Sequence, residues 1–163
     1  MGVYEILALV VGALFRTADD VINQKIFEKS IDLILVTDRV GTFVRVSPSS
    51  FAILGYEPVE MVGRSGIEFI YHPDLDNTRE MMRQQRLGNT TRHFDCRYVK
   101  KDGSICILTW TGVWSGEEAQ HFFIGRDITQ ARIAEQYKSI ADELERMSLS
   151  LTNLEKRISS NGS

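Results

Sequence analysis

The C-terminal part of the chain carries an apolar residue at every third or fourth position without interruption. The spacing is 4, 3, 4, 3, 4, 3, 4, and neither glycine nor proline occurs between Gln130 and Ile158. A strict heptad repeat places one narrow apolar stripe on a helix, and such stripes pair in coiled coils. The sequence therefore predicts a coiled-coil helix over 130–158 and a homodimer. A helix folded back on its own domain is the alternative. The stripe consists of Ile133, Tyr137, Ile140, Leu144, Met147, Leu151, Leu154 and Ile158.

Upstream of this helix, five runs have the composition of strands. They are rich in β-branched and aromatic residues and are bounded by turn sequences. Three short helical segments separate the second run from the third. This order predicts an α+β fold, with a five-stranded antiparallel sheet and short helices on one face. The strands are Ile31–Thr37, Thr42–Ser47, His93–Val99, Ser104–Trp114 and Gln120–Arg126, and the helices are Phe51–Leu54, Pro58–Met61 and Asn77–Leu87.

The fourth run is apolar on both faces, which is typical of a strand that is covered on both sides. We expect one face to lie against a core or pocket and the other against a helix or a partner subunit. The apolar residues are Cys106, Leu108 and Trp110 on one face and Ile105, Ile107 and Val113 on the other.

The segment 1–29 is predicted to be helical in two parts, with a cap near Thr17. In its second part Ile22, Ile26 and Phe27 should form one buried stripe. In its first part the apolar run Ile6–Phe15 is shorter than the roughly 20 residues that span a bilayer. No basic residue precedes this run, so a signal peptide is disfavoured. We expect it to pack on the core or a second subunit; contact with a membrane is the alternative.

The composition narrows the class of protein. The chain has 163 residues and a net charge of −3, which argues against a nucleic-acid partner. Its two cysteines, Cys96 and Cys106, lie in strand-like runs without metal-ligand spacing. They are expected to be buried free thiols, as suits a cytoplasmic protein. A location at the inner face of the membrane is the alternative, in which the first helix contacts lipid. The predicted domains are 1–29 helical, 30–129 globular, 130–158 coiled coil and 159–163 a disordered tail.

Seven short motifs occur in order along the globular part, and together they resemble those of a PAS domain with its PAC portion. The resemblance covers residues from about Ile26 to Thr129. It implies a sensory and dimerising module whose sheet surrounds a cavity, and whose Asp-Ile-Thr turn couples the sheet to a coiled-coil linker. The motifs are Thr37-Asp38-Arg39-Val40-Gly41, Val46-Ser47-Pro48-Ser49, Leu54-Gly55-Tyr56, Val62-Gly63, His72-Pro73-Asp74, Lys100-Lys101-Asp102-Gly103 and Gly125-Arg126-Asp127-Ile128-Thr129.

The last motif carries the expected signal coupling, through Asp127 and Thr129. Asp127 is placed to cap the output helix and to pair with a basic group, for which Arg126 and Arg132 are candidates. A strand that leads directly into a helix can transmit a displacement to it.

Family position and strand parity predict a ligand pocket lined by Phe51, Leu54, Phe69, Met82, Phe94, Trp110 and Phe123. Flavin photochemistry in relatives needs a helical cysteine, which the region 65–71 lacks. Haem in relatives needs a histidine on the helix after His72, and that helix has none. A non-covalent flavin stacked on Trp110 and Phe123 is disfavoured but left open. A small metabolite, or no ligand, is the favoured interpretation, and no metal site is expected.

Two functions follow from these patterns. The first is a sensor that relays a signal to a downstream effector, such as a histidine kinase or a cyclic-dinucleotide enzyme, in bacterial signal transduction. The second is a ligand-free interaction and dimerisation module. No nucleophile with a partnering base is recognisable, so an enzyme is not expected, and any catalytic effector would lie outside this chain.

Overall fold

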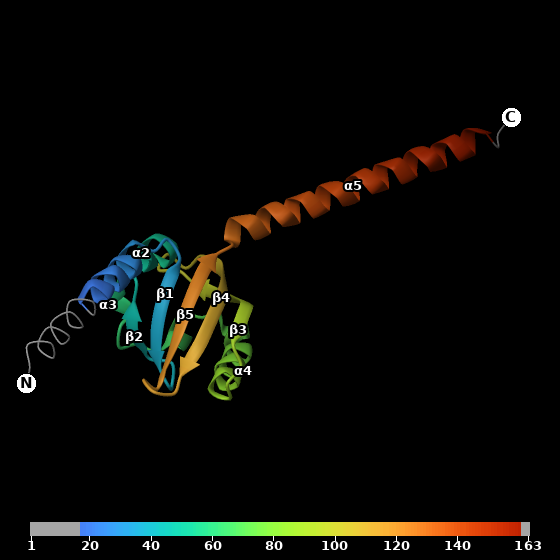
Figure 1. The fold of residues 1–163 in the computed structure, drawn as a ribbon. Coiled ribbons are helices and arrows are strands. Elements are labelled where there is room, and N and C mark those ends of the chain that lie inside the picture. Colours follow the sequence, from blue (N-terminus) through green and yellow to red (C-terminus); the bar gives the residue numbers. More distant parts are fainter. Residues whose placement is uncertain (1–16, 161–163) are drawn as a thin grey trace, which may run out of the picture. The chain divides into compact units, whose positions relative to one another are not determined.

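The computed structural model describes residues 17–160, which divide into two compact units. The first unit ends at Asp127 and contains a five-stranded antiparallel sheet (Figure 1). The strand order is β2-β1-β5-β4-β3, so the last strand of the sequence lies in the centre of the sheet. The α+β class expected from the sequence is confirmed. The strands are β1 (Leu33–Asp38), β2 (Phe43–Val46), β3 (Thr91–Val99), β4 (Ile105–Ser115) and β5 (Gln120–Asp127).

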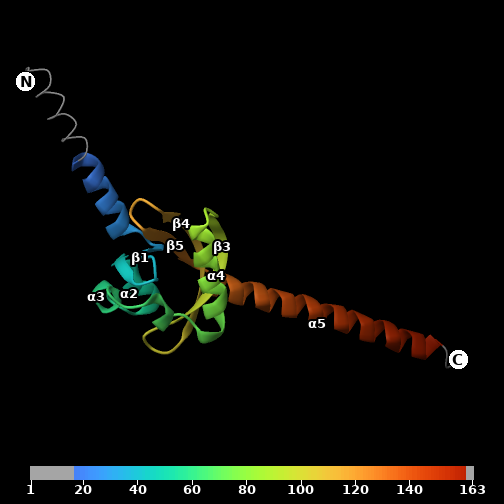
Figure 2. The same cartoon turned by 90° about the horizontal axis from the view of Figure 1, so that it is seen from below.

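Short helices fill the connection between β2 and β3 and lie on one face of the sheet (Figure 2). Gly55 ends the first of them in the left-handed conformation, with φ of 80°, which a residue without a Cβ adopts at little cost. The run Ile67–Tyr71 is divided between a 3₁₀ turn and a bridge from Ile70 to Tyr98. The helices are α2 (Ser49–Leu54), α3 (Pro58–Met61), η1 (Gly66–Glu68), η2 (His72–Asp74) and α4 (Leu75–Arg86).

The core lies between that face of the sheet and the short helices. Alternation along each strand turns one set of side chains inward, because successive Cβ atoms point to opposite faces. The inward residues of β1 and β4 are almost fully buried, and leucine and aromatic side chains of the helical segment pack against them. The buried residues of this core, from the sheet and the helical segment together, include Leu33, Leu35, Leu54, Met61, Phe69, Cys106, Leu108 and Trp110.

The opposite face of the sheet carries apolar side chains that are partly exposed. Ile124 of β5 pairs with Ile34 of β1, and Phe122 pairs with Val113 of β4. Phe122, Ile124 and Val113 are exposed, as judged from residues 17–160 alone. The expectation that a helix or a partner subunit covers this face therefore stays a prediction.

Residues 17–29 form a helix that contacts the edge strand β2. Arg45 stacks on the ring of Phe27 at 4.2 Å and donates a hydrogen bond to Gln24. The predicted buried stripe is wrong for two of its three residues, because Ile22 and Ile26 are exposed. The helix contacts the sheet through Phe27 and Gln24 instead. The run Ile6–Phe15 lies outside the described residues.

The second unit holds one helix, α5 (Thr129–Ser160), of 32 residues. It contains the whole heptad stripe, whose side chains are exposed in the single chain. The helix continues two residues beyond the predicted end at Ile158, so Ser159 and Ser160 are helical rather than part of a tail. Among residues 17–160, no helix is long and apolar enough to cross a membrane.

Candidate functional site

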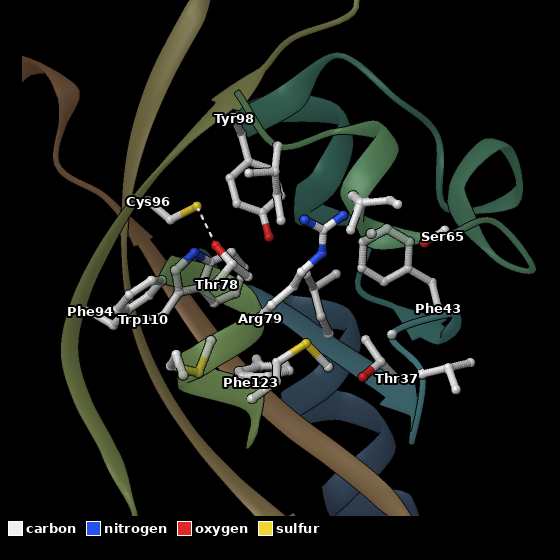
Figure 3. Close-up of a pocket in the computed structure, with 18 residues that line it drawn as sticks. Thr37, Phe43, Ser65, Thr78, Arg79, Phe94, Cys96, Tyr98, Trp110 and Phe123 are labelled. Atoms are coloured by element: carbon white, nitrogen blue, oxygen red, sulfur yellow. Dashed lines mark hydrogen bonds between the residues drawn. The ribbon is translucent and has the colours of Figure 1, made fainter. Parts of the chain in front are cut away.

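A cavity of about 180 Å³ lies between the inner face of the sheet and the helical segment (Figure 3). Strands β1, β3, β4 and β5 supply its floor, and α4 together with the turn at η1 supplies its opposite wall. Most of the lining is aromatic, aliphatic or sulfur-containing. The lining residues are Leu35, Thr37, Val40, Gly41, Phe43, Ser65, Gly66, Ile67, Ile70, Thr78, Arg79, Met81, Met82, Phe94, Cys96, Tyr98, Trp110 and Phe123.

Three aromatic rings from neighbouring strands form the floor. Trp110 packs on Phe123 with ring centroids 6.0 Å apart and on Tyr98 at 5.5 Å. Glycine allows this packing, because Gly125 stands opposite Trp110 in the β4–β5 ladder and the indole lies over it. A Cβ at Gly125 would lie 2.4–2.7 Å from three atoms of the indole, which is closer than non-bonded carbon atoms approach. The glycine that opens the Gly-Arg-Asp-Ile-Thr motif is thus required by the cavity floor.

The structure brings four of the seven predicted pocket residues together. Met82, Phe94, Trp110 and Phe123 line the cavity. Leu54 and Phe69 are buried in the adjoining core, where Phe69 meets the ring of Phe43.

Phe51 is the clear correction to the predicted lining. Its residue surface is 58% exposed, because the short helix α2 turns Ile53 and Leu54 inward and Phe51 outward. The buried residues of α2 are Ser50, Ile53 and Leu54, at the spacing i, i+3 and i+4, so the inward face of the helix is centred on a direction that Phe51 does not share.

Several lining residues were missed by reasoning from the sequence. Thr78 and Met81 share one face of α4 with the predicted Met82 at helical spacing, and Cys96 and Tyr98 share the parity of the predicted Phe94 on β3. These spacings were visible in the sequence. What was not visible is that α4 lies over the sheet rather than beside it.

An ion pair attaches the start of α4 to β3 and so holds this helix over the cavity. The Nε and Nη2 groups of the Arg97 side chain both donate hydrogen bonds to the carboxylate of Asp74. The Arg97 backbone N–H donates to the same carboxylate at 2.8 Å. These bonds lower the pKa of Asp74, with the Arg97 side chain as the main cause. Asp74 ends the His-Pro-Asp motif, so the motif has a structural role at the helix start.

The thiols of this domain are poor nucleophiles. Burial raises the pKa of Cys96 to about 11, although its sulfur contacts the hydroxyl of Thr78 at 3.5 Å. Burial likewise raises the pKa of Cys106 to about 11. Since the thiolate is the reactive form, neither cysteine is prepared for catalysis at neutral pH. Among residues 17–160, no cluster of three metal-binding side chains occurs.

A buried histidine joins the end of α4 to the sheet beside the cavity. His121 is fully buried, stacks on Phe123, and its Nδ1–H donates to Gln85 Oε1 at 2.7 Å. Gln85 Nε2 in turn donates to Thr91, which fixes the orientation of the amide. The other ring nitrogen lies 3.4 Å from the guanidinium of Arg86. The ring is therefore held in its neutral form.

Acid is expected to destabilise the domain through His121. Burial, with the nearby positive charge of Arg86, lowers its pKa from 6.5 to about 4, while Asp38 acts in the opposite direction. Between pH 6.5 and pH 4 the imidazole of His121 is protonated in the unfolded chain and neutral in the folded chain. The stability that comes from this difference is therefore fully present above pH 6.5 and is lost as the pH falls. The free energy of unfolding should drop by about 2 kcal/mol between pH 7 and pH 5 from this group alone.

Urea unfolding at both pH values measures that drop. His121→Gln should lose the His121 share of it, whereas His72→Gln, at an exposed position, should keep it. An NMR titration of the unaltered protein that shows the His121 ring charged at pH 6 would contradict the expectation.

The comparisons with known proteins agree with this architecture. A family model described as the PAS fold matches residues 27–133. The chain belongs to the PAS fold family. The resemblance seen in the seven motifs is thereby confirmed. A comparison with curated proteins found no significant match.

Solved PAS domains share the fold across distant organisms. The PAS domain of an HTR-like protein from Haloarcula marismortui is 27% identical, has a TM-score of 0.60, and aligns over 74% of this chain and 99% of its own. A domain of a sensory box sensor histidine kinase/response regulator from Geobacter sulfurreducens is 17% identical, with a TM-score of 0.59 over 67% and 94% of the two chains. The PAS domain of the RpfR quorum-sensing receptor from Cronobacter turicensis, in complex with BDSF, is 18% identical, with a TM-score of 0.54 over 63% and 98%.

The turn that ends the PAS domain is as short as the sequence suggested. Strand β5 ends at Asp127 and α5 begins at Thr129, so one residue separates strand from helix. Arg126, one of the two candidate partners of Asp127, directs its guanidinium to the carboxylate of Asp32 at 2.9 and 3.1 Å. That ion pair joins β5 to the residue just before β1.

Proposed function

We propose that this PAS domain is a sensory and dimerisation module of a bacterial signalling protein. In this proposal a small molecule in the cavity alters β5, the short turn carries the change into α5, and α5 pairs with its copy in a homodimer. A downstream effector, such as a histidine kinase or a cyclic-dinucleotide enzyme, would receive the signal and supply any catalysis.

One observation carries the proposal: a single strand both lines the cavity and leads to the helix. Phe123 lines the cavity, and two residues later Gly125 supports the indole of Trp110. Two residues after that, the strand ends at Asp127. A ligand that moves the Trp110 indole must therefore press on the backbone of β5 at Gly125. This position is two residues before Asp127 and four residues before Thr129, the proposed coupling residues.

Family membership supports the sensory part of this proposal. One structural relative comes from a sensor histidine kinase/response regulator, and another is a quorum-sensing receptor domain in complex with BDSF. The heptad stripe of α5 supports the dimeric part, because exposed apolar residues at a/d spacing are stabilised when a second helix covers them.

The relay can be tested with spin labels on α5. Ser148→Cys places a reactive thiol on an exposed position, and the two native thiols should remain unlabelled because they are buried and protonated. Toluene is a suitable probe, since an apolar cavity of about 150 Å³ accommodates benzene. We expect the distance distribution between the two labels of a dimer to change when toluene fills the cavity.

Filling of the cavity needs its own measurement in the same sample. The chain has two tryptophans, Trp110 in the cavity and Trp114 outside it, so Trp114→Phe leaves the cavity indole as the only fluorescent one. Saturation of the Trp110 signal without any change in label distances would contradict the relay. It would favour the alternative, a module that only holds two chains together.

A further inference from the structure

Of the lining residues, all of which lie within the described part of the chain, Arg79 alone is charged. Figure 3 shows its guanidinium extending from α4 toward the centre of the ring of lining side chains. A ligand with a charge in this cavity would therefore meet a cation, and an anion is the matching charge.

The present partner of Arg79 does not hold it strongly. Its Nη1 lies 2.9 Å from a carboxylate oxygen of Asp76, but the two side chains are 58% and 95% exposed. An exposed ion pair of this kind contributes little to stability, because solvent screens both charges. Arg79 can thus exchange Asp76 for a ligand at small cost.

Tyr98 provides a second donor for the same ligand. The residue is 6% exposed, and Figure 3 shows its hydroxyl directed into the middle of the cavity. A hydroxyl in this place can donate a hydrogen bond to a ligand in the cavity. Burial also raises the pKa of Tyr98, so the hydroxyl keeps its proton and can donate it.

The rest of the cavity is suited to a small apolar body. Phe94, Met81, Met82, Trp110 and Phe123 surround it with carbon and sulfur. Its volume of about 180 Å³ slightly exceeds the roughly 150 Å³ of an apolar cavity known to bind benzene. One ring or a short alkyl chain fits, with the head group toward Arg79.

We infer that the cavity selects a small apolar monocarboxylate, whose carboxylate accepts hydrogen bonds from Arg79 and the Tyr98 hydroxyl. This inference rests on the proposed sensory function and names the class of its ligand. A phosphate ester is a worse match, because it carries nearly two charges and three strong acceptor oxygens. One guanidinium and one hydroxyl leave too many of these unsatisfied in an apolar cavity.

Three probes with the same ring test the inference. Toluene is apolar, phenylacetamide is polar and neutral, and phenylacetate has the same shape with a negative charge. Each is titrated into the full chain carrying Trp114→Phe, and the fluorescence of Trp110 reports binding. We expect phenylacetate to bind at least tenfold more tightly than phenylacetamide, because charge-assisted hydrogen bonds are the stronger kind.

Two variants in this background locate the selectivity. Arg79→Gln should abolish the preference for the carboxylate and leave toluene binding unchanged. Arg83→Gln is the matched control, since Arg83 lies one turn further along α4, is similarly exposed and paired, and does not line the cavity. Tyr98→Phe should weaken phenylacetate binding several-fold without affecting toluene.

Equal affinity for phenylacetate and phenylacetamide would overturn the inference, as would a preference that survives Arg79→Gln. In both cases toluene binding would leave the proposed sensor intact. If none of the three probes changes the Trp110 signal or binds by calorimetry, the ligand class and the proposed cavity sensor fail together.

Discussion

A chain with aspartate at both Leu144 and Leu151 is expected to be a monomer at concentrations where the unaltered chain is expected to be a dimer. The two leucines are consecutive members of the same row of the heptad stripe on α5, and both are largely exposed in the single chain. In a parallel coiled coil each substitution would place two carboxylates opposite each other in the apolar seam. Burying unpaired like charges costs several kcal/mol at each layer, more than a seam of this length can offset.

Light scattering coupled to size exclusion gives the mass directly. Leu149→Asp is the matched control, because Leu149 is 60% exposed, close to the 61% of Leu151, but lies outside the heptad stripe. It should remain dimeric, while Leu151→Asp alone should weaken the dimer. A dimer that persists in the double variant would move the interface to the N-terminal segment or to the exposed sheet face around Phe122 and Ile124.

Gly125→Ala is expected to produce the largest loss of stability of any single change in the PAS domain considered above. The new methyl group would overlap the six-membered ring of Trp110, which is itself confined by Tyr98 and Phe123. A bulky ring cannot leave by a small rotation, so either the indole or the β5 backbone must move. Overpacking of this kind typically costs 1–3 kcal/mol, and we expect a value of about 3 kcal/mol or more here.

Urea unfolding of Gly125→Ala beside Gly116→Ala separates overpacking from the general effect of replacing glycine. A Cβ at Gly116 would meet its nearest atom at 3.8 Å, an ordinary contact, and this variant should unfold close to the unaltered chain. In Gly125→Ala the fluorescence of Trp110 should also change in the folded state. Equal stability of the two variants would show that the indole does not need the space above Gly125.

Alternation and turn residues were enough to predict most of the sheet. On β3, Cys96 and Tyr98 face the core and Asp95 and Arg97 face solvent, as the period of two requires. Gly103 closes the turn before β4 with a φ of 84°, as a turn containing Asp-Gly suggests. These features depend on neighbours in the sequence, so the sequence alone determines them.

The cavity was harder to predict because its wall depends on how distant segments pack. Arg79 is a polar residue in a polar helix, and only the position of α4 over the sheet turns it into a lining residue. His121 is fully buried by Gln85 from α4 and by the ring of Trp114, and the position of α4 cannot be read from the residues around His121. The opposite error was made for residues 17–29. Their periodicity predicted a buried apolar stripe, but Ile22 and Ile26 are exposed, because a periodic pattern does not show which surface would cover it.

The order of strands in the sheet has a consequence for synthesis on the ribosome. β1 is the first strand made, but one of its two neighbours is β5, the last. Pairings between segments so far apart in the chain close slowly, and until they close the edge of β1 stays open to other chains. The sheet can therefore be completed only when Gln120–Asp127 has left the exit tunnel, by which time much of α5 is already being translated. A nascent chain thus completes its sheet and its long helix at nearly the same moment, which limits the time during which unfinished sheets of neighbouring chains could pair with one another.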